Sequence, residues 1–391
     1  MARQRYALVL SGGGFKGAYQ VGALKYIMAN GIPHSNGVDM ITKFDIVAGV
    51  SVGALNGAIV ATNGMTMDGY AVLEKLWDDV AKKGHREIYE SEILDVTDNP
   101  EATKIGLNVE GILKKILPNS VFGTIVRAIF DSEDVGKQIE ANFKNLTGLT
   151  SNAPLLNKLK ALVSRATFPA GVTYRCGVVS LTDGQYYSLG PDDFDNDNDL
   201  RLAILSSAAL PLVWPPTPQI KTKDGRVLQN LTDGGVRNIT PLGDVISLIL
   251  KEDNTLDNWN IIVINCNPQA PTPAENDFVF GIADVALRVA NDLTLNEIFQ
   301  NDLQQFTQIN ELISQVDKAK AAGKIAADFH LTNDGRNLKK INIKIIEPND
   351  VSEVGDTLDS SKKAIQNRFK AGFLKAELIL NAPASDQQPW T

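Results

Sequence analysis

Two units of strand, glycine-rich turn and helix follow one another in the first 60 residues of the chain. Residues 6–10 form a short apolar run that ends at a glycine-rich turn, and residues 16–30 then carry apolar side chains at helical spacing. A second apolar run at residues 44–49 is followed by another turn and by the helix-forming residues 54–61. Because strands that alternate with helices pair in parallel, the sequence predicts an α/β protein with a mainly parallel central sheet.

The rest of the chain continues this pattern without a recognisable linker. Further strands are predicted at residues 172–181, 186–189, 227–231, 260–264 and 341–346. Further helices are predicted at residues 200–210, 242–250, 278–320 and 361–380. The segment from about residue 66 to 165 reads as a mostly helical insert. We therefore expect one domain over residues 1–380, with its motif-bearing core at 6–240, and a flexible tail over 381–391.

Composition and charge argue against several classes of protein. The 391 residues are 43% hydrophobic and 21% charged, which is ordinary for a globular protein. The net charge of −8 argues against a general nucleic-acid binder and against electrostatic attraction to anionic lipid. Cys176 and Cys266 are too few for a disulfide scaffold, and we expect both to be buried free thiols. The three histidines, His34, His85 and His330, leave little for a histidine-rich metal site.

The first residues contain no recognisable targeting segment. The apolar run at residues 6–10 is too short for the core of a signal peptide. No uncharged apolar run reaches the roughly 18 residues of a transmembrane helix. A soluble protein of the reducing cytoplasm is the prediction, and a protein exported without a cleaved signal would have the same features.

The segment Gly49-Val-Ser-Val-Gly53 has the Gly-x-Ser-x-Gly pattern of a nucleophile elbow. Its glycines allow a sharp turn between a strand and a helix, so that the Ser51 hydroxyl points outward. In a chain with 31 glycines the pattern also arises by chance, and the alternative is a turn whose serine caps the helix. The position of the segment after a predicted strand favours the nucleophile.

The segment Gly12-Gly-Gly-Phe-Lys-Gly17 follows the first predicted strand. It fits the Gly-x-Gly-x-x-Gly pattern of a dinucleotide site, but it lacks the acidic residue such a site needs at the end of the second strand. Successive N–H groups at a helix N-terminus also bind anions, including the oxyanion of an acyl-transfer intermediate. A plain turn is the third alternative. Lys16 would lie near a substrate phosphate or be a solvated lysine.

Asp233-Gly-Gly235 comes at the end of the predicted strand at residues 227–231. A carboxylate there would point into the same crevice as Ser51, where open α/β sheets bind their ligands. The alternative is an aspartate that only closes a turn or caps a helix. A serine nucleophile, a glycine nest and a strand-end carboxylate together indicate an acyl-transfer site.

Four segments in this order resemble the motifs of the patatin-like phospholipase family. Residues 12–17 are similar to its glycine-rich oxyanion motif, and residues 49–56 to its nucleophile motif. Ser207-Ala-Ala-Leu-Pro211 and Asp233-Gly-Gly235 are similar to its proline-containing and aspartate motifs. The resemblance covers residues 6 to about 240, and beyond these it is limited to the general pattern of helices and strands.

The resemblance implies a three-layer α/β/α fold and a lipid acyl hydrolase of the phospholipase A, lysophospholipase or esterase type. It implies a Ser–Asp dyad without histidine, with Ser51 as nucleophile and Asp233 as base, and an oxyanion loop of Gly12, Gly13 and Gly14. It implies neither a metal nor a cofactor. The expected partner is a lipid or phospholipid substrate, met by transient contact with a membrane or micelle surface. A dyad aspartate would need surroundings that raise its pKa toward neutrality.

Three other functions stay open. A Ser–Asp–His hydrolase would use Ser51, Asp233 and His330 in that chain order, although His330 follows a predicted helix and not a strand. A protein of the same fold could bind lipid without catalysis. A nucleotide-dependent oxidoreductase depends on the glycine segment alone. Of the other histidines, we expect His34 in a surface loop and His85 to be solvated.

Two weaker features remain. Four aspartates alternate between residues 193 and 199 as in a calcium loop, but Asn198 and Ile204 stand where such a loop needs Gly and Glu, so a solvated loop that caps the next helix is favoured. Residues 105–130 are strongly apolar, and we predict that part of them forms a lid or membrane-touching surface near the active-site mouth. An ordinary core segment is the alternative.

Overall fold

The computed structural model describes residues 3–34, 37–108, 147–211, 213–252, 257–268, 294–333 and 335–382. Within these residues the main strands are β1 (Gln4–Leu10), β4 (Ile46–Val50), β7 (Thr173–Ser180), β8 (Tyr186–Leu189), β9 (Thr217–Lys221), β10 (Val227–Asp233), β11 (Asn258–Ile264) and β14 (Asn342–Ile346). They form one sheet in the order β14–β11–β1–β4–β7–β10–β9, with β8 paired to β7. The strands from β14 to β7 are parallel, and β8, β9 and β10 pair in antiparallel fashion. The predicted mainly parallel sheet is confirmed.

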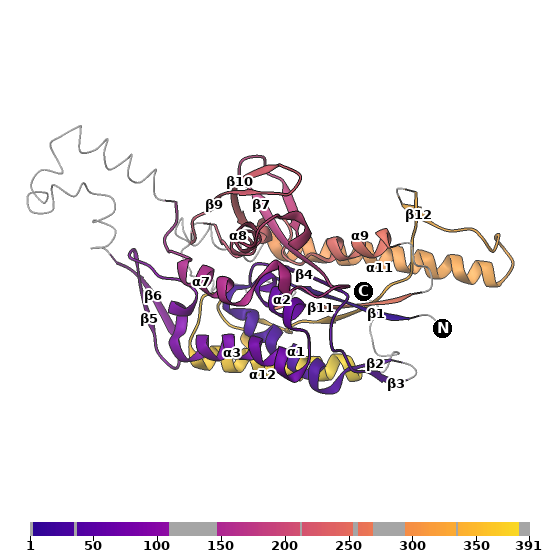
Figure 1. The fold of residues 1–391 in the computed structure, drawn as a ribbon. Coiled ribbons are helices and arrows are strands. Elements are labelled where there is room, and N and C mark those ends of the chain that lie inside the picture. Colours follow the sequence, from indigo (N-terminus) through magenta and orange to yellow (C-terminus); the bar gives the residue numbers. More distant parts are fainter. Residues whose placement is uncertain are drawn as a thin grey trace, which may run out of the picture.

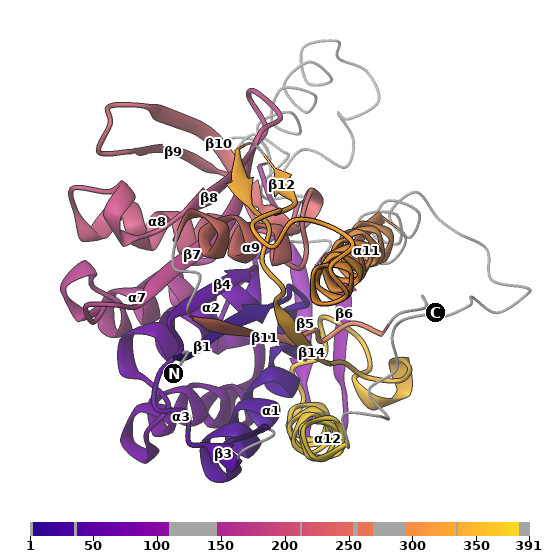
Figure 2. The same ribbon diagram turned by 90° about the vertical axis from the view of Figure 1, so that its right-hand side faces the viewer.

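Helices cover both faces of this sheet, as Figure 1 and Figure 2 show. The helices are α1 (Gly17–Asn30), α2 (Val52–Asn63), α3 (Met67–Lys83), α7 (Ala153–Leu162), α8 (Asp197–Ser207), α9 (Leu242–Lys251), α11 (Thr294–Ala321) and α12 (Lys362–Asn381). Leu8 and Leu10 of β1 belong to the apolar cluster that includes α1, α2, α3 and α12. Ala7 and Val9 belong to the cluster that includes α9 and α11. Since β1 is buried on both faces, the predicted three-layer α/β/α arrangement is confirmed.

The C-terminal helix α12 packs directly on α1. Gly372 lies so close to α1 that a Cβ atom added to it would collide with the carbonyl oxygen of Tyr19. Gly22 of α1 is packed in the same way against the carbonyl oxygen of Phe369. This contact joins the first helix of the chain to the last one, and it supports the proposal that residues 1–380 form one domain.

Replacement of Gly372 by alanine is therefore expected to lower the free energy of unfolding by several kcal/mol, since the two helices have to separate to admit the methyl group. Urea denaturation followed by circular dichroism would measure this. If residues 1–380 form one domain, the variant unfolds in a single transition at a lower midpoint. Early loss of α12 alone, with the rest unfolding as in wild type, would contradict the proposal. Gly243→Ala is the matched control, because a Cβ there meets open space.

In the predicted helical insert at residues 66–165, the structure describes residues 66–108 and 147–165, and these contain a hairpin as well as helices. α3 belongs to the core layer of α1, α2 and α12. It is followed by an antiparallel hairpin of β5 (Leu94–Asp98) and β6 (Thr103–Leu107). The turn between them is closed by Asn99, whose side chain accepts hydrogen bonds from the N–H groups of Glu101 and Ala102. The sequence offered a signal for this turn in Asn99-Pro100, between two alternating runs.

Two further hairpins are small, β2 (Ile32–His34) with β3 (Gly37–Asp39) and β12 (Thr332–Asn333) with β13 (Arg336–Asn337). Most of the predicted lid at residues 105–130 lies outside the described residues. Residues 383–391 of the predicted tail also lie outside them. α12 itself continues to Asn381. Among the described residues, the helices are too short or too polar to cross a membrane.

The prediction that His85 is solvated is wrong. Its side chain is buried, and its ring Nδ1 lies 2.6 Å from Asp98 Oδ2. Burial alone would raise the pKa of Asp98, but hydrogen bonds from His85, Ser360 and Thr103 outweigh it and hold the pKa below its ordinary value. His85 thus joins the end of α3 to the β5–β6 hairpin. This partner lies 13 residues away in the sequence and is supplied only by the fold.

Candidate active site

Ser51 occupies a tight turn between β4 and α2. Its backbone has φ 56° and ψ −127°, a strained conformation for a residue with a side chain. The turn packs closely on the neighbouring strand, so that a Cβ atom on Gly53 would collide with the carbonyl oxygen of Leu10. The Ser51 N–H donates to Ser207 Oγ at 3.0 Å, which anchors the turn to the end of α8. This is the backbone geometry that the Gly-x-Ser-x-Gly segment predicts for a nucleophile elbow.

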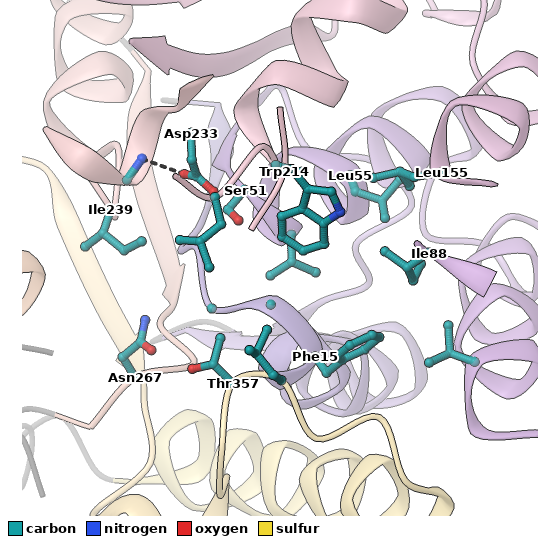
Figure 3. Close-up of a pocket in the computed structure, with 18 of the residues that line it drawn as sticks. Phe15, Ser51, Leu55, Ile88, Leu155, Trp214, Asp233, Ile239, Asn267 and Thr357 are labelled. Atoms are coloured by element: carbon teal, nitrogen blue, oxygen red, sulfur yellow. Dashed lines mark hydrogen bonds between the residues drawn. The ribbon is translucent and has the colours of Figure 1, made fainter. Parts of the chain in front are cut away.

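Strand β7 brings Ser51 and Asp233 together. Val50 of β4 pairs with Gly177, and Asp233 of β10 pairs with the next residue, Val178. β8 pairs with both Gly177 and Val178 and therefore occupies one edge of β7. β4 and β10 consequently run toward each other along the opposite edge and meet there. Because Ser51 directly follows Val50, the serine and the aspartate lie side by side (Figure 3).

The Asp233 carboxyl is 3% exposed and faces the serine. Its Oδ1 accepts a hydrogen bond from the Gly235 N–H at 2.7 Å, and the carboxyl also accepts one from the Ser51 hydroxyl. Burial raises the pKa of this carboxyl from its ordinary value of 3.8 to about 7, although the two hydrogen bonds act in the opposite direction. A carboxylate with this pKa can accept a proton near neutral pH far better than an ordinary aspartate.

The glycine loop lies next to these two residues, but its three glycines differ. Gly13 and Gly14 line the same pocket as Ser51 and Asp233. Within the described residues, the N–H groups of Gly13 and Gly14 have no backbone acceptor. The Gly12 N–H instead donates to the carbonyl of Ile239 at 2.9 Å, so it is not available to a bound oxyanion.

Buried amide side chains connect the glycine loop to the elbow. Gln20 Nε2 donates to the Ser11 carbonyl at 2.7 Å, and Asn56 Nδ2 donates to Gln20 Oε1 at 2.9 Å. Trp77 Nε1 donates to Asn56 Oδ1 at 2.9 Å. Ser11, Gln20 and Asn56 are fully buried, so the network has no competition from water. It fixes the positions of β1, α1 and α2 around the serine.

An apolar pocket extends from Ser51. In Figure 3, Phe15, Leu55, Ile88, Leu155 and Trp214 lie on one side of the serine. The other apolar residues that line it are Val52, Leu76, Trp77, Val80, Ala208, Leu210, Pro211, Val236, Ile239 and Leu358. This lining is mostly apolar and offers few groups that could bind a polar ligand.

Lys16, the three histidines and the two cysteines are not among the described residues that line this pocket. Lys16 is buried, so the alternative of a solvated lysine is wrong, and the described lining residues do not include it. His330 is exposed and is likewise not among them. His34 is half-buried, with Nε2 3.2 Å from Asp39 Oδ1. The prediction that Cys176 and Cys266 are buried free thiols is confirmed.

The aspartate-rich loop before α8 contains its own structural contacts. The side chain of Asn196 accepts from the Asp199 N–H at 2.9 Å and caps α8. Asp193 pairs with Arg175 at 2.6 Å, and Asp197 accepts from the Arg165 N–H at 2.8 Å. The prediction of a loop that caps the next helix is confirmed, with an asparagine as the capping residue.

Several residues of the site had no clear signal in the sequence. Asn267, after β11, lines the pocket, and its Nδ2 donates to the Gly12 carbonyl at 2.8 Å. Thr357 also lines it, and its carbonyl accepts from the Phe15 N–H at 2.9 Å. The buried Arg368 of α12 donates to three backbone carbonyls of the loop that carries Thr357. These residues are far from the motifs in the chain, and only the fold brings them there.

The fold and the site define an α/β protein with a mainly parallel sheet, in which a serine at a strained turn lies beside a buried aspartate and an apolar pocket. The family model described as "Patatin-like phospholipase" matches residues 8–246. The chain therefore belongs to the patatin-like phospholipase family, as its motifs indicated. Membership implies a lipid ester hydrolase. No curated protein matches the chain.

A search of solved structures found, among others, the crystal structure of VipD from Legionella pneumophila. The two chains are 14% identical, with a TM-score of 0.38. The match covers 96% of this chain and 66% of that one, so this chain spans somewhat less than two thirds of the length of VipD. At this level of similarity the match carries no argument about function.

Proposed function

We propose that this protein hydrolyses fatty-acyl esters of lipids through a Ser51–Asp233 dyad and an acyl-enzyme intermediate. The observation that carries the proposal is the meeting of the two residues at the edge of β7, beside an apolar pocket. The oxyanion donors are the N–H groups of Gly13 and Gly14, and Gly12 has a supporting role because its own N–H is already bonded. Phospholipase A, lysophospholipase and esterase activities all fit this site.

In the proposed reaction Asp233 takes the proton of the Ser51 hydroxyl as the serine oxygen attacks the ester carbonyl carbon. The carbonyl oxygen becomes an oxyanion, which the Gly13 and Gly14 N–H groups stabilise. The C–O bond to the alcohol then breaks, and Asp233 returns the proton to the leaving alcohol. A water molecule next gives its proton to Asp233 and attacks the acyl-enzyme, and collapse of this second intermediate releases the fatty acid and restores the Ser51 hydroxyl.

The apolar pocket is the proposed site of the acyl chain. Its aromatic wall is rigid, because Tyr89 contacts both Phe15 and Trp214, with ring centroids 6.3 Å and 5.7 Å apart. A hydrocarbon chain placed there would exchange water for apolar contacts, worth about 0.8 kcal/mol per buried methylene. The site therefore favours long acyl chains over short ones. Transient contact with a membrane or micelle and a cytoplasmic location remain predictions from the sequence.

The first test is hydrolysis of a p-nitrophenyl ester series from acetate to palmitate, together with a phospholipid in mixed micelles. We expect kcat/KM to rise with chain length until the pocket is filled. A fluorophosphonate probe is expected to label the protein once, at Ser51. Inactivity on every substrate, with no labelling, would overturn the proposal and favour a lipid-binding protein without catalysis.

Leu155→Trp is expected to shorten the preferred acyl chain. Leu155 is 4% exposed and lines the pocket on the side where the apolar residues gather, so an indole there would occupy space proposed for the acyl chain. We predict a loss of about 10- to 100-fold in kcat/KM for the longest esters, with short esters within about threefold of wild type. Leu156→Trp is the matched control, since Leu156 lies on the same helix but is not among the described lining residues. An equal loss on all esters would contradict an acyl role for the pocket.

A further inference from the structure

The peptide groups of residues 11–15 nearly all have partners. The carbonyls of Ser11, Gly13 and Gly14 accept hydrogen bonds from the Gln20 side chain, the Lys16 N–H and the Gly17 N–H, respectively. The N–H groups of Gly12 and Phe15 donate to the carbonyls of Ile239 and Thr357. Among the described residues, the Gly13 and Gly14 N–H groups have no backbone acceptor. A loop with hydrogen bonds on each side of these two donors is held in one conformation, as an oxyanion site requires.

The Gly12 carbonyl is the most heavily bonded group of this loop. It accepts from Asn267 Nδ2 at 2.8 Å and from the Cys266 thiol at 3.1 Å. The thiol is itself held by the Ser11 hydroxyl, whose oxygen lies 3.4 Å from the sulfur and also accepts from the Cys266 N–H at 2.9 Å. Cys266 and Asn267, which follow β11, therefore determine where the Gly12 carbonyl points.

That carbonyl belongs to the same planar peptide group as the Gly13 N–H. Two consequences follow for the proposed oxyanion donor. The plane of the peptide is fixed, so that a carbonyl held toward Asn267 directs the Gly13 N–H the opposite way. Donors on the carbonyl oxygen also polarise the amide, which makes its N–H a stronger hydrogen-bond donor.

We propose that Asn267 is a positioning residue of the reaction, which orients and polarises the Gly12–Gly13 peptide so that the Gly13 N–H stabilises the oxyanion. This inference rests on the proposed function. It extends the site beyond residues 8–246, which the family model matches, to a residue that none of the four motifs contains. Its effect falls on the transition state, because the negative charge on the oxygen develops only there.

The experiment compares wild type with Asn267→Leu, which has a similar shape but no donor. We expect kcat on a long-chain p-nitrophenyl ester to fall by about 10- to 100-fold, less than the loss of a direct oxyanion donor, with KM within about threefold of wild type. A long-chain trifluoromethyl ketone forms a tetrahedral oxyanion on the serine, and its inhibition constant is expected to rise by the same factor as kcat/KM falls. A residue with only a structural role would not produce this parallel change.

Asn260→Leu is the matched control, since it makes the same substitution in β11 itself, away from the strand end that leads to Asn267. It is expected to leave kcat and the inhibition constant as in wild type. If Asn267→Leu does not fold, Asn267→Asp keeps the shape and replaces the Nδ2 donor by an acceptor, so an even larger loss of kcat is expected. Normal kcat and inhibition in either folded Asn267 variant would overturn the inference alone. An inactive wild type that the fluorophosphonate does not label would instead overturn the proposed function.

Discussion

Ser51→Ala is expected to remove ester hydrolysis almost completely, with a loss in kcat on the order of 10⁵- to 10⁶-fold. The substitution deletes the proposed attacking oxygen, and the nearby Ser207 hydroxyl is already engaged by the Ser51 N–H. The fold should persist, because the Ser51 N–H still donates to Ser207 and Gly53 still fits against β1. The measurements are kcat on a long-chain p-nitrophenyl ester, labelling by the fluorophosphonate probe, and the thermal midpoint.

His330→Ala tests the rival triad in the same assay. His330 is exposed and is not among the described residues that line the pocket, so this variant is expected to retain wild-type kcat within about twofold. A folded but inactive His330→Ala protein would contradict the dyad and restore the Ser–Asp–His alternative. Substantial activity in Ser51→Ala would exclude Ser51 as the nucleophile.

Asp233→Asn is expected to lower kcat by about 10⁴-fold, because the amide cannot accept the serine proton. The wild-type pH profile should identify the same group. Since burial raises the pKa of the Asp233 carboxyl to about 7, the basic form is present only above that pH. We therefore predict that kcat/KM rises tenfold per pH unit below about 7 and reaches a plateau above it. A profile that is flat between pH 5 and 8 would contradict Asp233 as the base.

The same substitution should stabilise the protein at alkaline pH. The carboxyl has a pKa of 3.8 when exposed and about 7 when folded, so the folded state binds the proton more tightly. The resulting stability is fully present below pH 3.8 and is lost as the pH rises through 7. At pH 8 the buried charge costs about 4 kcal/mol, which the neutral asparagine avoids.

Urea denaturation at several pH values would measure this effect. The free energy of unfolding of Asp233→Asn is expected to exceed that of wild type at pH 8, and the difference should shrink as the pH falls toward 4. A difference that does not change with pH would show that Asp233 is not buried as an ionised group. The gain in stability would come with the loss of activity, as is common where an active site contains a buried charged group.

The elements predicted from sequence were most accurate where a periodic apolar run ends at a glycine. The helix expected at residues 16–30 ends at Gly31, which has φ 71° and follows α1 as its cap. The hairpin at residues 94–107 was missed because each strand is only five residues long and β5 contains no buried residue. β9 was missed as well, because Pro218 is unusual in a strand and is accommodated here by the sheet edge.

The sequence by itself determined the local geometry of the site. The glycines of Gly-x-Ser-x-Gly permit a sharp turn between a strand and a helix, and successive glycines before a helix permit a turn that exposes N–H groups. Such features depend on the sterics of a few adjacent residues, so they can be predicted from the sequence. The order of the four motifs along the chain indicated the family, which the family model matches over residues 8–246.

Only the tertiary structure decided which of these groups are available and what their pKa values are. The Gly12 N–H is occupied because Ile239 reaches it, and Asn267 holds the Gly12 carbonyl from 255 residues away. The pKa of Asp233 is raised to about 7 because the fold buries it where β4 and β10 meet on β7. Burial and hydrogen bonding are properties of the groups that surround an atom, and most of those groups come from distant parts of the chain.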